Sequence, residues 1–331
     1  MKHFKFLLFI IIFLVSGYNY AQKDHVGTSM ANYLKIGIGG KAVAMAETFT
    51  AISDDPTALF WNPGGIGFQK NLALNFSYTQ WIFQTNSSFF GTVIPFGDIG
   101  TFGVSVNSFN SGDIEETTIT KPHGTGRVFD ASDISIGVSY ARMLTDRFSA
   151  GITLKYIQEN LSLESASAVA ADIGSIFILD FNYNLRLGLV ISNLGSNMKL
   201  SGLDLEKNIT TENSKLVEAQ LKTYDWALPL TFRVGLAADL ISNDVHKLTL
   251  AVEVNDARDY KARENIGIEY GFDSMFFLRG GYKFNYDEES YTLGLGINYS
   301  IEGVGGLIVD YAYAAMNRLG QINRLSIGLS F

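Results

Sequence analysis

The side chains that could carry out acid–base, nucleophilic or metal chemistry are few and scattered in this chain of 331 residues. Cysteine is absent, which excludes thiolate nucleophiles, thiolate metal ligands and disulfides. The sequence contains neither a His-Glu-x-x-His motif nor a Gly-x-Ser-x-Gly nucleophile turn. Its four histidines stand far apart, at His3, His25, His123 and His246. We therefore predict a protein that is not an enzyme and that binds no cofactor and no metal.

Two motifs near the N-terminus could hold an ion, but each also has a structural interpretation. The glycine-rich run at residues 35–40 lacks the preceding strand and the spaced third glycine of a phosphate-binding loop, so it favours flexible chain. The pair Asp54 and Asp55 could bind Ca²⁺, or it could cap or end a helix predicted over residues 41–52. The second interpretation is favoured, because Pro56 follows directly and proline ends or redirects a helix.

The charge and composition indicate what surrounds the protein. Lys and Arg number 25 against 33 Asp and Glu, a formal net charge of −8, which argues against nucleic acid as a partner. Charged residues make up only 18% of the chain, against about 25% in typical soluble domains. Glycine is abundant at 33 residues and aromatic residues reach 13%. We infer many strands, and a surface that partly faces something other than water.

The first 21 residues have the three-part pattern of a signal peptide. Lys2 and Lys5 precede an apolar run at residues 6–15, and small and polar residues follow up to Ala21. The apolar run is shorter than the about 20 residues that a spanning helix needs, and no later stretch reaches about 18 consecutive apolar residues. We therefore expect cleavage after Ala21 and export. The alternative is an uncleaved anchor helix at residues 1–21.

From residue 71 onward, the chain alternates between apolar side chains and small or polar ones. In the segment 292–299, leucine, isoleucine and tyrosine point one way, while threonine, glycine and asparagine point the other. The polar face also carries charges such as Arg279 and Asp310, and tyrosines such as Tyr299 mark the ends of the apolar face. A soluble antiparallel sandwich also alternates. Apolar-out, polar-in strands with aromatic girdles, however, are typical of a transmembrane β-barrel.

Counting these segments predicts an all-β membrane protein, a 14-stranded antiparallel outer-membrane β-barrel over residues 71–331. The expected strands are 71–82, 87–96, 100–110, 132–143, 146–158, 169–180, 184–194, 230–241, 246–256, 264–273, 274–284, 290–300, 305–315 and 321–331. The even-numbered connections are short, and the odd-numbered ones include 111–131, 159–168, 195–229 and 257–263. Short turns face the periplasm and long loops face outward in bacterial barrels, so this parity supports the count.

Residues 22–70 do not alternate, and we predict that they form a helical plug. A barrel of this size is wide enough that its lumen either conducts water or is filled. This segment is the candidate plug of adequate size. The lumenal charges then either mark a conducting path or form a neutralised network that locks the plug, and both interpretations stay open.

Part of the plug resembles a known family. Residues 39–47 (GGKAVAMAE), 51–55 (AISDD) and 59–66 (LFWNPGGI) resemble the N-terminal signature of the PorV/PorQ family, which belongs to the FadL-like fatty-acid-transporter barrels. The motif residues are Gly39, Gly40, Lys41, Asp54, Asp55, Trp61, Asn62, Pro63 and Gly64. The sequence departs from the family pattern at Lys41, where arginine is usual, at Ala46, where glycine is usual, and at Gly64, where alanine is usual. The resemblance implies fourteen strands and a hatch at the Asn-Pro motif.

The resemblance also implies a role in Bacteroidota type IX protein secretion, as an accessory protein in the outer membrane. Members of the family bind the C-terminal secretion signals of cargo at the cell surface and dock on the translocon or the attachment complex. The implied partners are therefore the outer-membrane bilayer, these type IX proteins and cargo C-terminal domains. The wider FadL-like group implies the alternative, an outer-membrane transporter for hydrophobic small molecules.

Two further segments are candidate interaction sites. The expected outward loop 195–229 carries more apolar residues than a free loop exposes, so it either contacts a partner or packs over the barrel mouth. Its candidate partner-binding residues are Leu203, Leu205, Leu216, Val217 and Leu221. The last strand resembles the end of other outer-membrane barrels, with alternating apolar residues and a terminal aromatic. We predict Ile327, Leu329 and Phe331 as its assembly signal.

Overall fold

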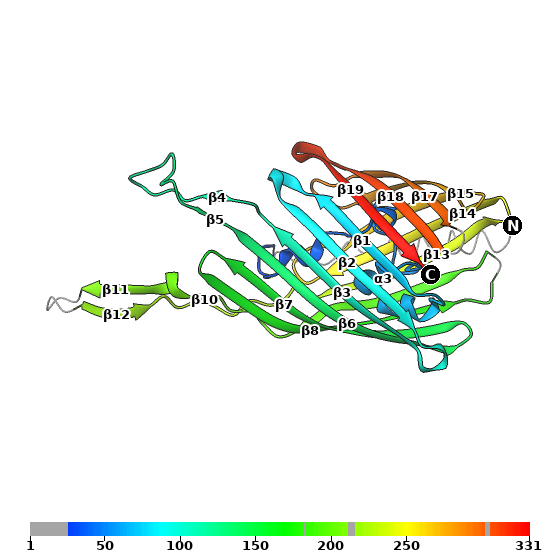
Figure 1. The fold of residues 1–331 in the computed structure, drawn as a ribbon, viewed down its shortest axis with the longest axis horizontal. Coiled ribbons are helices and arrows are strands. Elements are labelled where there is room, and N and C mark those ends of the chain that lie inside the picture. The colour runs from blue at the N-terminus through cyan, green and yellow to red at the C-terminus, as the bar shows by residue number, and fades with distance from the viewer. Residues whose placement is uncertain (1–25, 182, 211–215, 302–304) are drawn as a thin grey trace.

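The computed structural model describes residues 26–181, 183–210, 216–301 and 305–331. The expected signal peptide, residues 1–21, lies outside the described residues. Fourteen of the described strands form one closed antiparallel barrel (Figure 1), which confirms the predicted fold class and strand count. They are β1 (Ala73–Gln80), β2 (Asn86–Pro95), β3 (Thr101–Asn110), β6 (Ala131–Thr145), β7 (Phe148–Leu161), β8 (Glu164–Ile178), β9 (Arg186–Gly195), β13 (Thr231–Ser242), β14 (His246–Ala257), β15 (Arg263–Phe272), β16 (Phe276–Phe284), β17 (Tyr291–Ile301), β18 (Gly305–Met316) and β19 (Gly320–Ser330).

The barrel strands follow one another around the ring in chain order, and the ring closes between the first and the last. In that seam Ala73 of β1 lies opposite Ser330 of β19, and Gln80 lies opposite Asn323. Each of the fourteen strands therefore has a hydrogen-bonded partner on both sides, which is what a sheet needs in order to stand in lipid.

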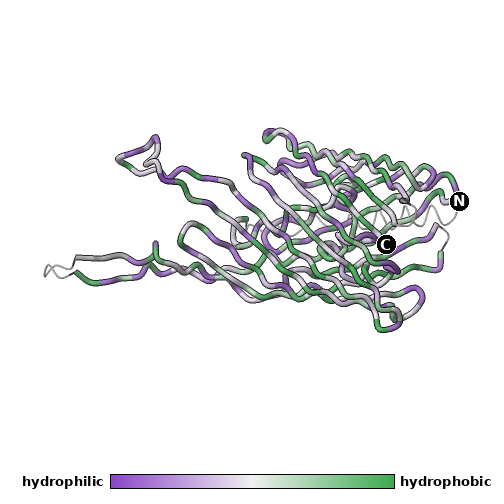
Figure 2. The backbone as a smooth tube through the Cα atoms, viewed as in Figure 1, coloured by the Kyte–Doolittle hydropathy of each residue, from purple (hydrophilic) through white to green (hydrophobic). Residues whose placement is uncertain are grey.

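Hydrophobic and hydrophilic residues alternate along the strands (Figure 2), and their exposure alternates in step. On β19, for example, Ile327 is 42% exposed and points outward, whereas Ser326 is 2% exposed and points into the lumen. The same holds for Arg279, Asp310 and Arg324, which are buried in the lumen. The predicted apolar-out, polar-in orientation of the strands is therefore confirmed at these positions.

The two ends of the barrel differ in the length of their connections. One end, which we call the turn end, carries short connections such as residues 96–100, 146–147 and 243–245. The other, the loop end, carries residues 111–130 and 196–230. By the rule for bacterial barrels, the turn end faces the periplasm.

Two hairpins project from the loop end (Figure 1). They are β4 (Ile114–Glu115) with β5 (Val128–Phe129), and β11 (Glu206–Thr210) with β12 (Leu216–Gln220). Between β9 and β11, the short strand β10 (Ser201–Gly202) pairs with β8, and the 3₁₀ turn η5 (Leu203–Leu205) follows it.

The expected loop at residues 159–168 is wrong. Strands β7 and β8 continue through this segment and are joined at residues 162–163, with Leu161 opposite Glu164. The two strands therefore stay paired through a segment in which hydrophobic and hydrophilic residues no longer alternate clearly. The remaining short connections contain the 3₁₀ turns η3 (Ile82–Gln84), η4 (Gly97–Ile99) and η6 (Asn317–Leu319).

The segment before β1 lies in the lumen as four short helical pieces. They are η1 (Asn32–Lys35), α2 (Gly40–Ala44), α3 (Ala58–Trp61) and η2 (Pro63–Phe68). The single helix predicted over 41–52 is wrong, because α2 ends at Ala44 and the backbone of Ala46 and Glu47 then takes positive φ values of 53° and 66°. No helix among the described residues is long and apolar enough to cross a membrane.

Candidate functional site: the plug and the loop end

The plug chain crosses the lumen from the loop end to the turn end. At the loop end, Ser29 bridges Ala227 of the long connection, and the amide of Met30 donates to the Ala227 carbonyl at 3.1 Å. At the turn end, the hydroxyl of Ser149 donates to the carbonyl of Gly64 at 2.7 Å. The chain has therefore passed through the barrel before the first barrel strand begins.

Lumen-facing glycines allow the plug to lie directly on the barrel wall. A Cβ atom on Gly267, Gly281 or Gly294 would overlap the plug at residues 44–48. A hydroxyl completes this contact, because Thr292 Oγ1 donates to the carbonyl of residue 44 at 2.9 Å and accepts from the amide of residue 46 at 3.0 Å. Glycine is used here for close backbone approach, which explains part of its abundance in the sequence.

The residues of the hatch motif are brought together around Asn62, which is fully buried. Its amide nitrogen donates to the carbonyls of Thr50 at 2.8 Å and Ser175 at 3.0 Å, and its Oδ1 accepts from the amide of Gly64 at 3.0 Å. Pro63 begins η2, where its missing N–H leaves no hydrogen bond unmade. A Cβ on Gly64 would lie 2.7 Å from the Cα of Ser175, which accounts for glycine where the family pattern has alanine.

Trp61 fills the centre of the plug and is also fully buried. Its Nε1 donates to the carbonyl of Ile38 at 3.1 Å. The rings of Phe49 and Phe60 meet it edge to face, with centroids at 6.5 and 5.0 Å, and the guanidinium of Arg233 lies 4.8 Å from the ring. Trp61 thus contributes packing, a hydrogen bond and a cation–π contact to the plug.

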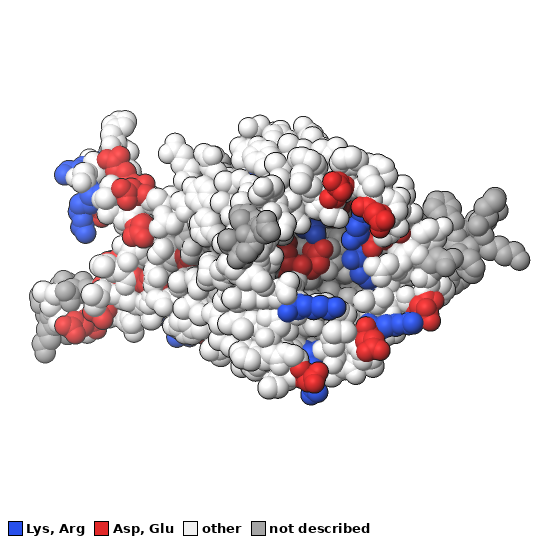
Figure 3. Space-filling view, turned by 45° about the vertical axis from the view of Figure 1, so that its right-hand side comes forward, with Lys and Arg blue, Asp and Glu red and all other residues white. Residues whose placement is uncertain are grey.

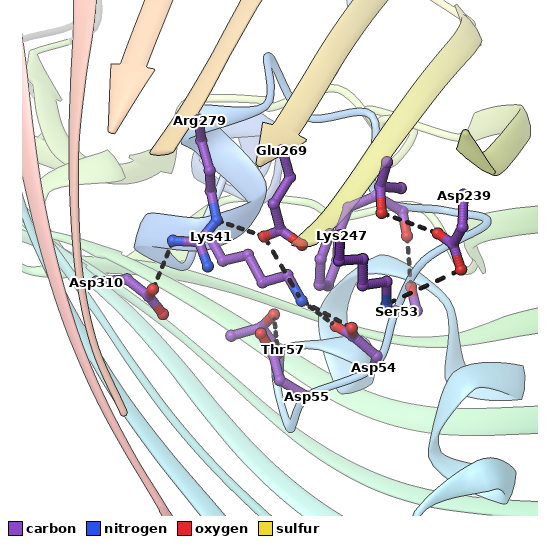
Figure 4. Close-up of polar contacts among 12 residues, drawn as sticks. Lys41, Ser53, Asp54, Asp55, Thr57, Asp239, Lys247, Glu269, Arg279 and Asp310 are labelled. Atoms are coloured by element: carbon purple, nitrogen blue, oxygen red, sulfur yellow. Dashed lines mark hydrogen bonds and ion pairs between the residues drawn. The ribbon is translucent and has the colours of Figure 1, made fainter. Parts of the chain in front are cut away.

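A chain of ion pairs joins the plug to the wall (Figure 4). Lys41 Nζ contacts both carboxylate oxygens of Asp54 at 2.7 Å and lies 4.0 Å from Glu269. Arg279 in turn binds Glu269 and Asp310, each at 2.6 Å. Each of these charges is paired with an opposite charge, across strands β15, β16 and β18, and this favours a locked plug over a path of free charges for conduction.

Gly39 and Gly40 place α2 against this network. Gly39 has φ of 80°, a value that glycine adopts without strain. The amide of Gly40 donates to Ser326 Oγ at 2.9 Å, and a Cβ on Gly40 would lie 2.7 Å from the carbonyl oxygen of Asp310. Both glycines of the motif therefore serve the docking of the plug on β18 and β19.

Asp55 caps the turn before α3. Its Oδ1 accepts from the amide of Thr57 at 2.7 Å and from the Thr57 hydroxyl at 2.5 Å. Burial, and then the neighbouring charge of Asp54, raise the pKa of Asp55 to about 6. The described residues contain no group of three or more His, Asp or Glu side chains placed to hold a metal ion.

The turn end of the barrel is hollowed, and acidic and basic side chains gather in the hollow (Figure 3). Two charged side chains around the plug are accessible to solvent: that of Asp54 is 43% exposed and that of Lys247 is 46% exposed. Lys247 Nζ lies 3.9 Å from Asp239, which also binds Arg186 at 2.6 Å. The network that holds the plug can therefore be reached by ions from this end.

The long connection at the loop end has a buried base and an exposed tip. Met198 and Leu228 at its base are buried against Ala31 and its neighbours in the plug chain. The tip is the hairpin β11–β12 with its flanks, which we call the tip hairpin (residues 203–221). Of its predicted binding residues, Leu205 is half-buried, whereas Leu203, Leu216, Val217 and Leu221 are exposed. The base of the connection therefore packs over the barrel mouth, whereas the tip is exposed and available for contact.

The predicted assembly residues lie on the outer face of the last strand. Ile327 and Phe331 are exposed, Leu329 is half-buried, and the amide of Phe331 donates to the carbonyl of Leu72 at 2.9 Å. These positions belong to the seam with β1, where the barrel closes.

Several residues that hold the plug were not among the predicted site residues. Thr292 is one; Glu253 is another, since it accepts from the amide of Thr50 at 3.0 Å. Both occupy lumen-facing strand positions, as do the glycines that touch the plug. In the sequence, glycine, threonine and charged residues at the lumen-facing positions of the strands are the signal that could have identified the part of the barrel wall that contacts the plug.

Solved structures with a similar fold include three FadL-like or hydrocarbon-transporting barrels. The toluene transporter TbuX of Ralstonia pickettii is 13% identical with a TM-score of 0.58, covering 89% of this chain and 98% of that chain. The monoaromatic hydrocarbon channel CymD is 11% identical with a TM-score of 0.56, covering 89% and 98%. A FadL homologue of Pseudomonas aeruginosa is 13% identical with a TM-score of 0.52, covering 89% and 99%. At these identities the likeness concerns the fold alone.

Comparison by sequence gives two results. No curated protein sequence matches the chain. The sequence model of the family described as "Type IX secretion system protein PorV" matches residues 19–258, which include the whole plug motif and the tip hairpin.

Proposed function

The chain belongs to the PorV family of type IX secretion proteins, and from this membership we propose that it binds a secretion partner through its tip hairpin. The family and the fold are those of a secretion component or a channel, located in the outer membrane. The finer proposal is that the hairpin contacts a cargo C-terminal domain or a protein of the translocon or attachment complex.

The exposure of apolar side chains on the tip hairpin carries this proposal. Leu216 is 72% exposed, and Leu203, Val217 and Leu221 are exposed with it. Large apolar side chains that stay exposed on both faces of a projecting hairpin are available for contact with another protein. The hairpin also stands clear of the barrel on a base that is packed, so a partner could reach both of its faces (Figure 1).

Replacing residues 203–221 with a short Gly-Ser linker tests the proposal. The barrel should still assemble, because long surface loops contribute little to the stability of the element they connect. We expect proteins with type IX C-terminal signals to accumulate in the periplasm or to remain unattached at the surface, measured by profiling the secreted and surface proteins. As a matched control, the other projecting hairpin, residues 113–129, is replaced in the same way and should leave secretion unchanged. Normal secretion in the 203–221 variant would contradict the proposal.

A second candidate function is transport of hydrophobic small molecules. The observation behind it is that the barrel shares its fold with hydrocarbon channels. Release through the wall would need an opening beside the hatch. Strands β7 and β8 stay paired without a break from Phe148 and Phe177 to Leu161 and Glu164, whereas the pairing of β8 with β9 shifts register between Ala171 and Ile173. The unbroken pairing counts against a side opening between β7 and β8, and the β8–β9 shift is the irregularity nearest to the contact of Asn62 with Ser175. Deleting the gene and then measuring both secretion and the uptake of a labelled fatty acid or aromatic hydrocarbon separates the two functions, since impaired uptake with normal secretion would favour the transporter.

A further inference from the structure

A cavity of about 400 Å³ lies at the loop end of the lumen, above the plug. It is bounded by the plug chain at residues 32–36 and by lumen-facing positions on β3, β6, β7 and β13–β15. Its volume falls in the range of sites that bind small organic molecules, about 300–1,000 Å³. Its lining is rich in charged and aromatic side chains, which is unlike the greasy pocket expected of a hydrocarbon path.

Three of the charged residues that line this cavity, Lys35, Glu47 and Glu289, are paired with an opposite charge within the protein. Lys35 binds Asp259 at 2.6 Å. Lys283 binds Glu47 at 2.8 Å and is also paired with Glu289. Two groups of polar and charged residues that line the cavity take no part in these ion pairs.

The first group is a row of polar side chains on three adjacent strands. Arg233, Asn255 and Arg263 lie opposite one another in register on β13, β14 and β15. Arg233 is 6% and Asn255 is 9% exposed, yet Arg233 Nε and Asn255 Oδ1 have no hydrogen-bond partner in the described part of the chain. The carboxylate of Glu253 stays 4.0 Å from Arg233 Nε, beyond hydrogen-bond range.

Arg263, in the same row, contacts two aromatic rings. Its guanidinium carbon lies 3.9 Å from the centroid of the Tyr260 ring and 4.2 Å from that of Tyr286. Such cation–π contacts hold the guanidinium in place without supplying an oxygen acceptor for its N–H donors. Arg233 Nε, a buried donor without a partner, and the guanidinium of Arg263 together form a site for a carboxylate.

The second group is a pair of carboxylates on neighbouring strands. Asp133 and Glu159 lie directly opposite each other on β6 and β7, and both line the cavity. Glu159 accepts from the amide of Ala31 at 2.8 Å, but neither carboxylate takes part in an ion pair within the described ranges. Like charges placed directly opposite in a sheet destabilise it, and a bound cation would relieve the repulsion.

We propose that this cavity binds a dipolar organic ligand, a basic α-amino acid either free or as the last residue of a peptide. The α-carboxylate lies against Arg233 and Arg263, and the cationic side chain lies against Asp133 and Glu159. The aliphatic part of the ligand lies beside the ring of Trp81, which also lines the cavity. This goes beyond the role proposed for the tip hairpin and does not depend on it, because the cavity is formed by other residues.

Titration calorimetry of the purified full-length barrel in detergent tests the proposal, with L-arginine as the probe. Two analogues each lack one of the charges: agmatine has no carboxylate, and L-norvaline has no cationic side chain. Each should bind about ten- to a hundredfold more weakly than arginine, the loss expected for a missing charged hydrogen bond. A tripeptide ending in arginine, with a free or an amidated carboxyl group, then distinguishes a chain end from a free amino acid.

Substitutions test the arginine row and the carboxylate pair separately. Arg263→Gln and Asp133→Asn should each weaken arginine binding by about tenfold or more. Arg142→Gln, which changes an exposed arginine on β6 near the turn end, is the matched control and should leave it unchanged. Equal binding of arginine and both analogues, or no binding of arginine at about 10 mM, would overturn the proposal.

Discussion

Replacing Asn62 with alanine should loosen the plug, because its side chain joins two parts of the plug, at Thr50 and Gly64, to each other and to the wall at Ser175. The side chain makes three hydrogen bonds, to the carbonyls of Thr50 and Ser175 and from the amide of Gly64, and it is fully buried. Leaving a buried polar group without its partner costs about 1–3 kcal/mol. Because neighbouring losses are not additive, we expect about 3–6 kcal/mol in the free energy of opening the plug. That corresponds to an opening equilibrium about 10²- to 10⁴-fold larger.

Cysteine labelling measures this opening directly, because the chain contains no cysteine of its own. Ser53 is 1% exposed and lies in the plug, so Ser53→Cys places a thiol where a reagent reaches it only after the plug opens. The substitution removes the hydrogen bond from the Ser53 hydroxyl to the carbonyl of Phe49, and it does so equally in every protein that is compared. A maleimide reagent should label it slowly in the parent protein. In the Asn62→Ala background the labelling rate should rise in proportion to the opening equilibrium, until labelling itself limits the rate.

Asn107→Ala is the matched control for this experiment. Asn107 is also a lumen-facing asparagine, 4% exposed, but neither polar atom of its side chain has a hydrogen-bond partner in the described structure. Removing it should leave the labelling of Ser53→Cys unchanged. Equal acceleration by Asn62→Ala and Asn107→Ala would show that loss of buried volume, and not of hydrogen bonds, opens the plug, and would refute the reasoning.

Three further predictions concern the wall, a titratable group and close packing. Ile327→Arg should reduce heat-modifiable folded barrel far more than Ser326→Arg, since a cation on the lipid face costs about 2–4 kcal/mol at the midplane, and equal damage would mean that the two faces are reversed. The pKa of Asp55 is about 6 in the folded protein, above the pKa of about 3.9 of an unfolded aspartate. Between these values the folded state binds more protons than the unfolded state, so the stability falls as the pH rises from about 4 to 6. Asp55→Asn should flatten this fall in the melting temperature, and an unchanged pH profile would contradict the assignment. Gly281→Ala should lower the melting temperature because its Cβ overlaps the plug. Gly280→Ala should not, because its Cβ would meet Leu293 and Thr292 at an ordinary contact distance of 3.7 Å; equal effects would argue against close packing.

The barrel could be predicted because each strand carries its own signal. A strand that faces lipid on one side and a packed lumen on the other must alternate, and that alternation is local in the sequence. The prediction failed at residues 159–168, where alanine points inward and serine points outward along residues 164–168. The hairpin extends beyond the bilayer there, so no lipid imposes apolar residues on its outer face, and the alternation loses its contrast.

The plug could be located but its shape could not be predicted. The run from Lys41 to Ile52 has a helical pattern, yet the helix ends at Ala44. Thr292 holds the backbone at the point where the helix stops, by bonding both residue 44 and residue 46. Such a contact comes from a strand 246 residues away in the sequence. Local propensity carries no information about it, and tertiary contacts override a weak helical preference.

The path of the plug sets an order for assembly. Ser29 lies at the loop end, whereas β1 begins at the turn end, so the chain before β1 runs the length of the lumen inside a ring that closes between β1 and β19. The first and last strands meet only after the whole chain is available, and the glycine-lined wall leaves no slack around plug residues 44–48. The ring must therefore close around a segment that already lies within it, or that segment must thread the finished ring from one side. In the first case plug and seam form in one step, and a weakened plug would appear as slow closure of the barrel.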